Sequence, residues 1–178
     1  PKLEITDELI AVRPDLESFA GEKLTVVTWL WARTVKSPNP AFSQVDVPLV
    51  KSFVLSSKKG HEAWLKPIVN GDTYTFKVTK GIADEDYKNG TRVGSKGNFK
   101  CIMSDVPISN KYIREHGSAS GFKNILLAVV CDAGRKRIFI EPQFAPEFEI
   151  DKEPSWKPNQ YMPSNPRYIS PPLYGLKQ

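Results

Sequence analysis

Twelve residues near the N-terminus, Leu24 to Val35, restrict the fold more than any other part of this chain. They read LTVVTWLWARTV, without Gly, Pro or Asn, and Val, Thr and Trp fit the pleated surface of a sheet better than a helix. Apolar residues occur on both alternating faces, with Leu24, Val26, Leu30 and Ala32 on one and Val27, Trp29, Trp31 and Val35 on the other. The pattern predicts a central strand that is buried on both sides.

Shorter strand patterns follow at residues 47–56, 62–69, 73–80, 98–103, 124–131 and 137–140. Asn70-Gly71 predicts a hairpin, and Pro67 favours an edge position for the strand that precedes it. Ser109 is a suitable helix cap, and Gly117 a suitable end for that helix. We therefore expect a mainly β or α+β fold with antiparallel strands and one or two short helices.

Charge and proline are unevenly distributed along the 178 residues. Residues 1–22 carry 2 basic and 6 acidic side chains, residues 23–140 carry 19 and 9, and residues 141–178 carry 4 and 5. Eight of the 15 prolines lie in the last 38 residues. We expect an acidic N-terminal lead-in (1–22), a basic, mainly β domain that holds the folding core (23–140), and an extended Pro-rich tail (141–178).

The sequence carries no mark of secretion or of a membrane. The N-terminus lacks the basic-then-apolar pattern of a signal peptide, and no apolar run approaches the roughly 20 residues that cross a bilayer. Cys101 and Cys131 are too few for a disulfide framework, so we expect a cytoplasmic location and no membrane partner. Because the chain opens without Met, we expect it to be part of a longer protein.

No group of catalytic residues stands out in the sequence. His61 and His116 are the only histidines and belong to no nucleophile or metal pattern, and no GxSxG, Walker-type or GxGxxG loop occurs. Neither cysteine has a neighbouring His, which favours two buried structural thiols. We therefore expect no catalytic and no cofactor-binding residue in this chain.

The basic middle of the chain favours a polyanionic ligand, nucleic acid above all, with a merely solubilising surface as the alternative. Two basic clusters, Lys58-Lys59 and Arg135-Lys136-Arg137, fall on expected turns, where side chains reach outward. Trp29 and Trp31 lie in the most apolar strand, so core packing is favoured for at least one of them over base stacking. The candidates for contact with DNA phosphates are Lys36, Lys51, Lys58, Lys59, Lys96, Lys100, Arg135, Lys136 and Arg137.

Several short motifs follow one another in order. Residues 29–40 read WLWARTVKSPNP, continued by AF at 41–42, VPLV at 47–50 and KKG at 58–60. Later come KCIMS at 100–104, VP at 106–107, NPR at 165–167 and YGL at 174–176. In this order, from about residue 26 to residue 176, they resemble the central segment of the predicted adenine-specific DNA methylases that carry a zinc-ribbon insert.

The resemblance implies a division of labour within a larger protein. In that family this segment lies between a Gly-rich motif that binds S-adenosylmethionine and an Asp-Pro-Pro-Tyr motif that grips the target base, and neither motif occurs here. The chain would then be a middle domain of an S-adenosylmethionine-dependent methyltransferase. Its expected partners are duplex DNA and the flanking methyltransferase domain of the same protein.

The sequence departs from the family at the zinc site. Family members have cysteines at the positions of Ser37, Phe42, Cys101 and Ser104, and only one of the four is a cysteine here. A structural zinc needs about four ligands, so the resemblance implies degenerate zinc-ribbon-like knuckles, and we expect no metal. We expect packing of four apolar side chains in its place, namely those of Phe42, Phe99, Ile102 and Met103.

Two functions follow from these expectations. The first is a non-catalytic middle domain that assists DNA binding or target recognition. The second is a structural insert or protein-interaction module that braces the methyltransferase halves without touching DNA. Salt-sensitive binding of DNA by the isolated chain distinguishes them. A stand-alone enzyme is less favoured, because the sequence shows no site.

Overall fold

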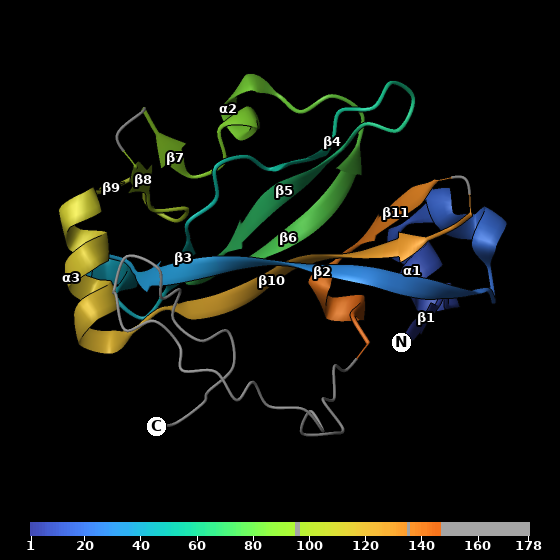
Figure 1. Ribbon diagram of the computed structural model, residues 1–178, viewed down its shortest axis with the longest axis horizontal. Helices are drawn as coiled ribbons and strands as arrows, with labels where there is room; N and C mark the ends of the chain where they lie inside the picture. The colour runs from blue at the N-terminus through green and yellow to red at the C-terminus, as the bar shows by residue number, and fades with distance from the viewer. Residues whose placement is uncertain (95–96, 135, 147–178) are drawn as a thin grey trace, which may run out of the picture. The chain divides into compact units, whose positions relative to one another are not determined.

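The strand β2 (Lys23–Lys36) runs through the centre of the largest sheet, as its sequence predicts (Figure 1). It pairs along most of its length with β10 (Lys123–Asp132), and β11 (Arg137–Ile140) follows on the far side of β10. On its other edge, β1 (Lys2–Glu4) pairs with its beginning and β3 (Asp46–Pro48) with its end. All of these pairs are antiparallel, and the expected mainly β, α+β fold is confirmed.

The computed structural model describes residues 1–94, 97–134 and 136–146. Within these ranges lie two smaller antiparallel sheets, β4 (Val54–Ser56), β5 (Ala63–Asn70) and β6 (Thr73–Lys80), and β7 (Arg92–Val93), β8 (Asn98–Lys100) and β9 (Pro107–Ile108). The α-helices are α1 (Asp7–Val12), α2 (Glu85–Lys88) and α3 (Asn110–Ser120). The 3-10 helices are η1 (Pro14–Phe19), η2 (Pro40–Phe42) and η3 (Pro142–Phe144).

The strand β2 is not buried on both sides, contrary to the prediction. The side chains of Val27 and Trp31 are 44% and 56% exposed. Val26 pairs with Cys131 and Thr28 pairs with Val130, so Val27 is a bulged residue with no residue opposite. One extra residue in a strand reverses the faces of everything that follows it.

The bulge divides the apolar residues of β2 between two cores. Leu24 and Val26 pack in a first cluster with residues of β1, α1, η1, β10 and β11. Ala32 and the partly buried Leu30 pack instead against a second cluster that includes Leu65 of β5 and residues of β6. The predicted grouping of these four β2 residues on one face is therefore wrong.

The expected hairpin at Asn70-Gly71 is confirmed. Asn70 pairs with Thr73 across Gly71, which has a φ of 57°, and Phe76 and Val78 on the second strand are both 3% exposed. The preceding strand β5 is not an edge strand as a whole, because β4 lies beside it.

The edge position predicted from Pro67 is nevertheless found in the part of β5 that begins at this residue. On the edge of β5 that faces β4, the strand pairing is followed by a hydrogen bond from the Leu65 N–H to the carbonyl of Phe53, at 2.8 Å. From Pro67 onward, no other described strand pairs with this edge of β5. The missing N–H of proline therefore costs no ladder bond.

The helix α3 begins as predicted but ends later. The Ser109 hydroxyl accepts a hydrogen bond from the Tyr112 N–H at 3.2 Å, which confirms the cap. The helix continues past Gly117 and ends before Gly121, which has a φ of 71°. A Cβ atom at Gly117 would lie 2.4 Å from the Phe122 ring, so this glycine makes room for an aromatic side chain.

The folding core extends beyond the expected limits of 23–140 at both ends. In the lead-in, Leu3, Ile5, Leu9 and Leu16 are at most 4% exposed and belong to the first cluster. After the expected boundary, Glu141 is fully buried and η3 packs on the same cluster. The remainder of the expected tail, residues 147–178 with Trp156, lies outside the described residues.

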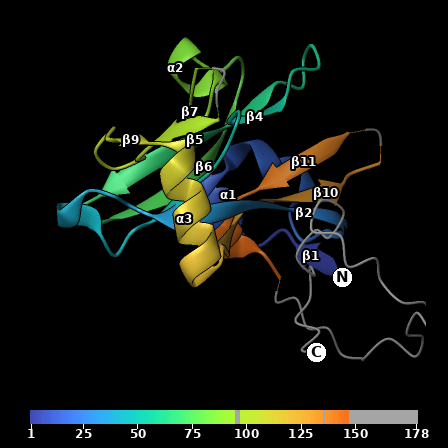
Figure 2. The same ribbon diagram turned by 60° about the vertical axis from the view of Figure 1, so that its left-hand side comes forward.

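A third cluster closes the C-terminal end of β2, where α3 packs (Figure 2). Val35, Val47, Cys101 and Ile108 are all fully buried there. Of the residues expected to replace a zinc ion by packing, Phe99 and Met103 contact this cluster and Ile102 contacts the second one. Phe42 is only half-buried and belongs to none of the three clusters.

Candidate nucleic-acid interface

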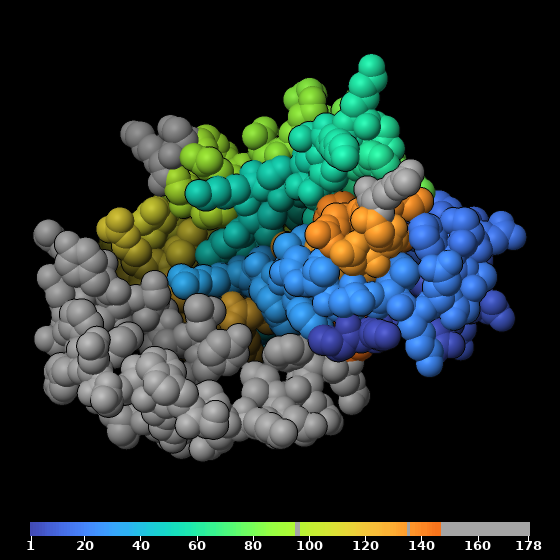
Figure 3. Space-filling view, turned by 45° about the vertical axis from the view of Figure 1, so that its right-hand side comes forward, coloured from blue at the N-terminus to red at the C-terminus, as the bar shows by residue number. Residues whose placement is uncertain are grey.

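Two turns that are distant in the sequence come together beside one cleft. The turn between β4 and β5 carries Lys58, and the turn between β10 and β11 leads into Lys136 and Arg137. All three residues line a cavity of about 330 Å³. Figure 3 shows the segment around the first turn lying against β11. The structure therefore brings together one residue from the first predicted basic cluster and two from the second.

The three cations differ in how far they are neutralised. Arg137 forms an ion pair with Asp132 at 2.8 Å. The Lys136 ammonium lies 4.6 Å from the centroid of the Phe19 ring, a cation–π contact that leaves its charge available. The Lys58 side chain has no ion-pair partner among the residues that the structure describes. The cavity is thus positively charged and open to an anion.

A second cavity, of about 240 Å³, adjoins the first, since His61, Lys136, Arg137 and Phe139 line both. Its apolar walls include four residues that are at most 6% exposed, namely Leu16, Ala63, Val78 and Ile138. Its charged residues are the carboxylates Asp15 and Glu62 and the cations Arg13, Lys80, Lys136 and Arg137. We call the two cavities together the basic cleft, with a cationic lobe (330 Å³) and an apolar lobe (240 Å³).

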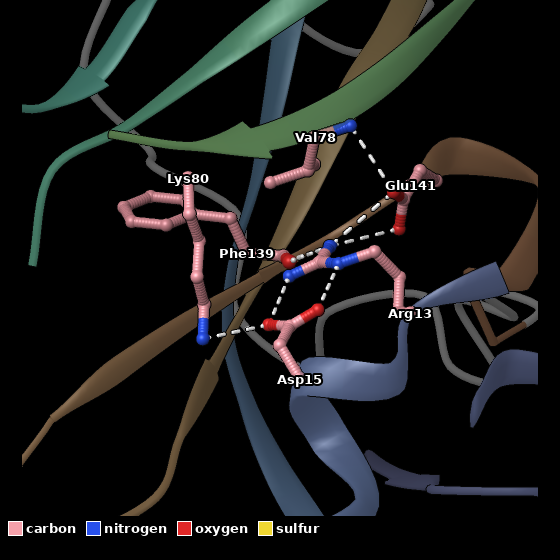
Figure 4. A network of polar contacts seen from close by, with 6 residues as sticks. All are labelled: Arg13, Asp15, Val78, Lys80, Phe139 and Glu141. Carbon is pink, nitrogen blue, oxygen red and sulfur yellow. Dashed lines mark hydrogen bonds and ion pairs between the residues drawn. The ribbon is translucent and has the colours of Figure 1, made fainter. Parts of the chain in front are cut away.

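Beneath the apolar lobe lies a network of charged groups centred on Arg13, whose guanidinium is almost completely buried (Figure 4). It donates to both carboxylate oxygens of Asp15, at 2.8 and 3.0 Å, and to the Phe139 carbonyl at 3.1 Å. The Lys80 ammonium reaches the same carboxylate at 2.9 Å. Arg13 thus joins η1 to β11, while Asp15 joins η1 to β6.

Glu141 completes this network from the end of β11. Its carboxylate is fully buried, and each of its oxygens lies 3.2 Å from the Arg13 guanidinium. One oxygen also accepts the backbone N–H of Val78 at 3.1 Å. A buried carboxylate is tolerated only when it is paired and hydrogen-bonded, and here the pairing fastens β6 to the largest sheet.

The network determines the ionisation of two of its members. Burial alone would raise the pKa of Asp15, but hydrogen bonds from Arg13 and Lys80 outweigh burial and hold it at about 2. Burial would lower the pKa of Arg13, but its bonds to Asp15 and Glu141 raise it instead. The carboxylate at the floor of the apolar lobe is therefore ionised at neutral pH.

The other predicted phosphate contacts are dispersed. Lys36 and Lys100 are engaged in ion pairs, with Asp46 at 3.1 Å and Asp105 at 2.7 Å. Lys59 is exposed on the same turn as Lys58, and Lys51 is exposed between β3 and β4. Lys96 and Arg135 lie outside the described residues.

The cleft and the Lys36 ion pair lie toward opposite ends of β2. Asp132, at the start of the β10–β11 turn, pairs with Thr25 near the beginning of β2, whereas Lys36 is its last residue. At about 3.3 Å per residue the two positions are roughly 35 Å apart. The predicted basic residues therefore form at least two separate groups.

Three of the four zinc-knuckle positions meet near the C-terminal end of β2. The Ser37 hydroxyl lies 3.3 Å from the Cys101 thiol, and the buried Ser104 hydroxyl has no hydrogen-bond partner among the described residues. Burial raises the pKa of Cys101, but the nearby polar groups, namely both serine hydroxyls and the N–H groups of Met103 and Ser104, outweigh burial, so the pKa is lowered. The other cysteine, Cys131, has its pKa raised to about 11 by burial.

The donors at this site do not fit a structural zinc. One thiol, two hydroxyls that stay protonated at neutral pH and a phenyl ring cannot supply the four ligands. Elsewhere in the described ranges, no three His, Cys, Asp or Glu side chains gather in an arrangement that could hold a metal ion. Cys101 is thus a buried thiol that is hydrogen-bonded to Ser37.

Sequence reasoning found Lys58, Lys136 and Arg137 but missed the residues that shape the cleft. His61 and Lys80 belong to separate local patterns, and only the packing of the sheets brings them together. Glu141 gave no signal, because a lone Glu before a Pro-rich stretch reads as solvent-exposed. Arg13 and Asp15, two residues apart around a proline, offered at most a weak sign of a local ion pair.

The comparisons with known proteins add nothing to this description. No family model matches the chain, and neither a curated protein nor a solved structure matches it. Within the described residues, no helix has the length and apolar character needed to cross a membrane.

Proposed function

We propose that this chain is a non-catalytic DNA-binding domain that holds duplex DNA through the basic cleft. The observation that carries the proposal is the convergence of Lys58, Lys136 and Arg137 on one cavity from two distant turns. Phosphate contacts by Lys and Arg supply most of the sequence-independent affinity of proteins for DNA. Lys58, Lys136 and Arg137 are all exposed, as contact with a broad polyanion requires.

The resemblance to adenine-specific DNA methylases gives this domain a place in a larger protein. We propose that it is the middle domain of such a methyltransferase and that S-adenosylmethionine is bound by the parent protein outside this chain. Its own residues would position DNA or assist target recognition, and the methyl transfer would occur on the flanking domain. The convergence of Ser37, Cys101 and Ser104 supports the resemblance, since knuckle positions distant in the sequence lie together.

The experiment is binding of a labelled duplex to the chain, measured by fluorescence anisotropy across a salt series. We expect a log–log slope of about −3 to −6, because each neutralised phosphate contributes about −0.9. The double variant Lys58→Glu/Lys136→Glu should weaken binding and make the slope shallower. A matched control is Lys111→Glu/Arg114→Glu on α3, which makes the same change of net charge near the other end of β2.

Each outcome bears on the proposal. If the control weakens binding as much as the cleft variant does, net charge and not the cleft accounts for the affinity. If the unmodified chain binds no duplex even at low salt, the DNA-binding function is wrong.

A second candidate function is bracing of the two methyltransferase halves without DNA contact. The exposed side chains of Trp31 and Val27 on β2 favour it, since exposed apolar surface can mark a docking site. This function predicts no affinity for DNA and a blue shift of tryptophan fluorescence when the flanking methyltransferase domain is added. A Trp31→Ser variant should abolish that shift, and a shift that persists would argue against this surface.

A further inference from the structure

We infer that the basic cleft accommodates one unpaired nucleotide, with its phosphate in the cationic lobe and its base in the apolar lobe. The inference rests on the proposed function and adds to it the form of DNA that binds best. It follows from the size, the charge and the walls of the two lobes.

The size of the lobes restricts the ligand. At about 330 and 240 Å³, they lie at or below the lower end of ordinary small-molecule sites, about 300–1,000 Å³. A stacked base pair cannot enter a lobe of this size, whereas a single base that has left the stack can.

The charge of the lobes orients the ligand. Lys58, Lys136 and Arg137 line the cationic lobe, so a phosphate is favoured there. Arg13, Lys80, Lys136 and Arg137 also line the apolar lobe, but of the two lobes only this one has carboxylates, Asp15 and Glu62, which repel a phosphate. Carboxylate oxygens accept hydrogen bonds from the exocyclic amino groups that bases carry on their edges. The base and its phosphate therefore have distinct preferred positions.

The walls of the apolar lobe suit a flat aromatic ligand. The half-buried Phe139 lines both lobes, so its ring borders the passage from one to the other. Bases stack on such rings with little dependence on sequence, and one stacked base contributes roughly five- to 150-fold in affinity. In Figure 4 the Phe139 ring and the Lys80 stem lie on the same side of the Arg13 network. Lys80 can donate to a ring nitrogen or carbonyl of a base.

The floor of the lobe is held in place before any ligand arrives. Asp15 is fixed by two hydrogen bonds from Arg13, and Arg13 is fixed in turn by Glu141. A polar group whose rotamer is already set loses little entropy on binding. The polar groups at the floor of the apolar lobe are therefore preorganised for binding.

The test compares two labelled duplexes of the same sequence at one salt concentration, one fully paired and one with a single unpaired nucleotide. We expect the chain to bind the second at least about fivefold more tightly, as stacking on one ring implies. The Phe139→Leu variant keeps an apolar side chain but removes the stacking face. It should lose the preference and bind the two duplexes with affinities within about twofold of each other.

A second variant guards against a folding defect, because Phe139 packs against the second core cluster. Glu62→Gln changes a partly exposed residue of the lobe and should reduce the preference for the unpaired nucleotide with little effect on the thermal unfolding midpoint. Equal affinity of the unmodified chain for both duplexes would overturn the inference and leave the proposed function standing. A preference that survives both substitutions would also overturn it, and binding of neither duplex would refute both proposals.

Discussion

Basic residues lie near both ends of β2, but their surroundings differ between the two ends. At the N-terminal end, Lys58, Lys136 and Arg137 line one cavity; Arg137 pairs with Asp132, but Lys58 has no ion-pair partner among the described residues. At the C-terminal end, Lys36 forms an ion pair with Asp46, and Lys100 forms an ion pair with Asp105. A count of lysines along the sequence treats the two groups alike. Pairing with nearby carboxylates determines which of them can bind an anion, and only the structure reveals that pairing.

The two ends also differ in how their buried polar groups are satisfied. Beneath the cleft, Arg13, Asp15 and Glu141 form a charged network in which each member has several partners. At the other end, Cys101 is hydrogen-bonded to the neutral hydroxyl of Ser37. The first arrangement depends on charge and the second does not, so substitutions should affect the two ends differently.

The largest expected effect comes from rebuilding the knuckle at the C-terminal end. We expect the triple variant Ser37→Cys/Phe42→Cys/Ser104→Cys to bind Co²⁺ with a strong thiolate charge-transfer band and to gain several kcal/mol of stability from Zn²⁺, since structural zinc in small peptides contributes about 10–16 kcal/mol. The unmodified chain is the control and should give no such band. Absence of the band in the variant would contradict the equivalence of these positions with the family's cysteines.

At the opposite end, removal of one member of the charged network should cost the most stability. Arg13→Met leaves the Glu141 carboxylate buried without its cation, which typically costs about 3–5 kcal/mol. Urea unfolding followed by tryptophan fluorescence measures the loss. The matched control is Lys23→Met, which breaks an exposed ion pair with Glu4 and should cost less than about 1 kcal/mol. Similar losses of stability in the two variants would show that the buried network stabilises the fold no more than an exposed ion pair does.

DNA binding offers a direct comparison of the two groups of cations. Lys58→Glu/Lys136→Glu should weaken binding of a duplex about 10- to 100-fold at moderate salt and reduce the salt slope by about 2. Lys36→Glu/Lys100→Glu makes the same change of net charge and should alter affinity less than about threefold, because each lysine already has a carboxylate partner. Equal losses of DNA affinity in the two double variants would contradict the proposed difference between the two groups of cations.

The smallest expected effect is on the pH dependence of stability. The pKa of Asp15 is lowered from 3.8 to about 2 in the folded protein, so its stabilisation is complete above about pH 5 and is lost as the pH falls toward 2. After allowance for its partial exposure, we expect a contribution of about 1 kcal/mol. Denaturant melts between pH 2 and 6 should show a shallower slope for Asp15→Asn, and unchanged slopes would argue against the ion pairs of Asp15.

Much of the fold was predictable, because local patterns and turn chemistry dominate it. The strand β2, the Asn70-Gly71 hairpin and the Ser109 cap each depend on a few adjacent residues. The bulge at Val27 was not predictable, since its cause is the register with β10 and not the sequence of β2. The end of α3 was misplaced for a similar reason, because the Phe122 ring that occupies the space at Gly117 comes from beyond the helix.

The candidate site was predictable only in part. Exposed turn lysines could be found from the sequence, so Lys58 and Lys136 were correctly placed on turns. Their convergence depends on how the sheet β4–β5–β6 packs against β10 and β11, and no local pattern encodes that. Glu141 was assigned to an extended tail because a buried carboxylate can be recognised only from its partners.

The hydrogen bond from the Val78 N–H to Glu141 has a consequence for how one copy of the chain meets another. Val78 lies on β6, the outer strand of its sheet, where an unpaired N–H invites strand addition by a neighbouring molecule. Glu141 occupies that N–H, and on the opposite edge Pro67 has none to offer. At these two positions the sheet is therefore a poor template for edge-to-edge aggregation, and loss of Glu141 would free the Val78 N–H.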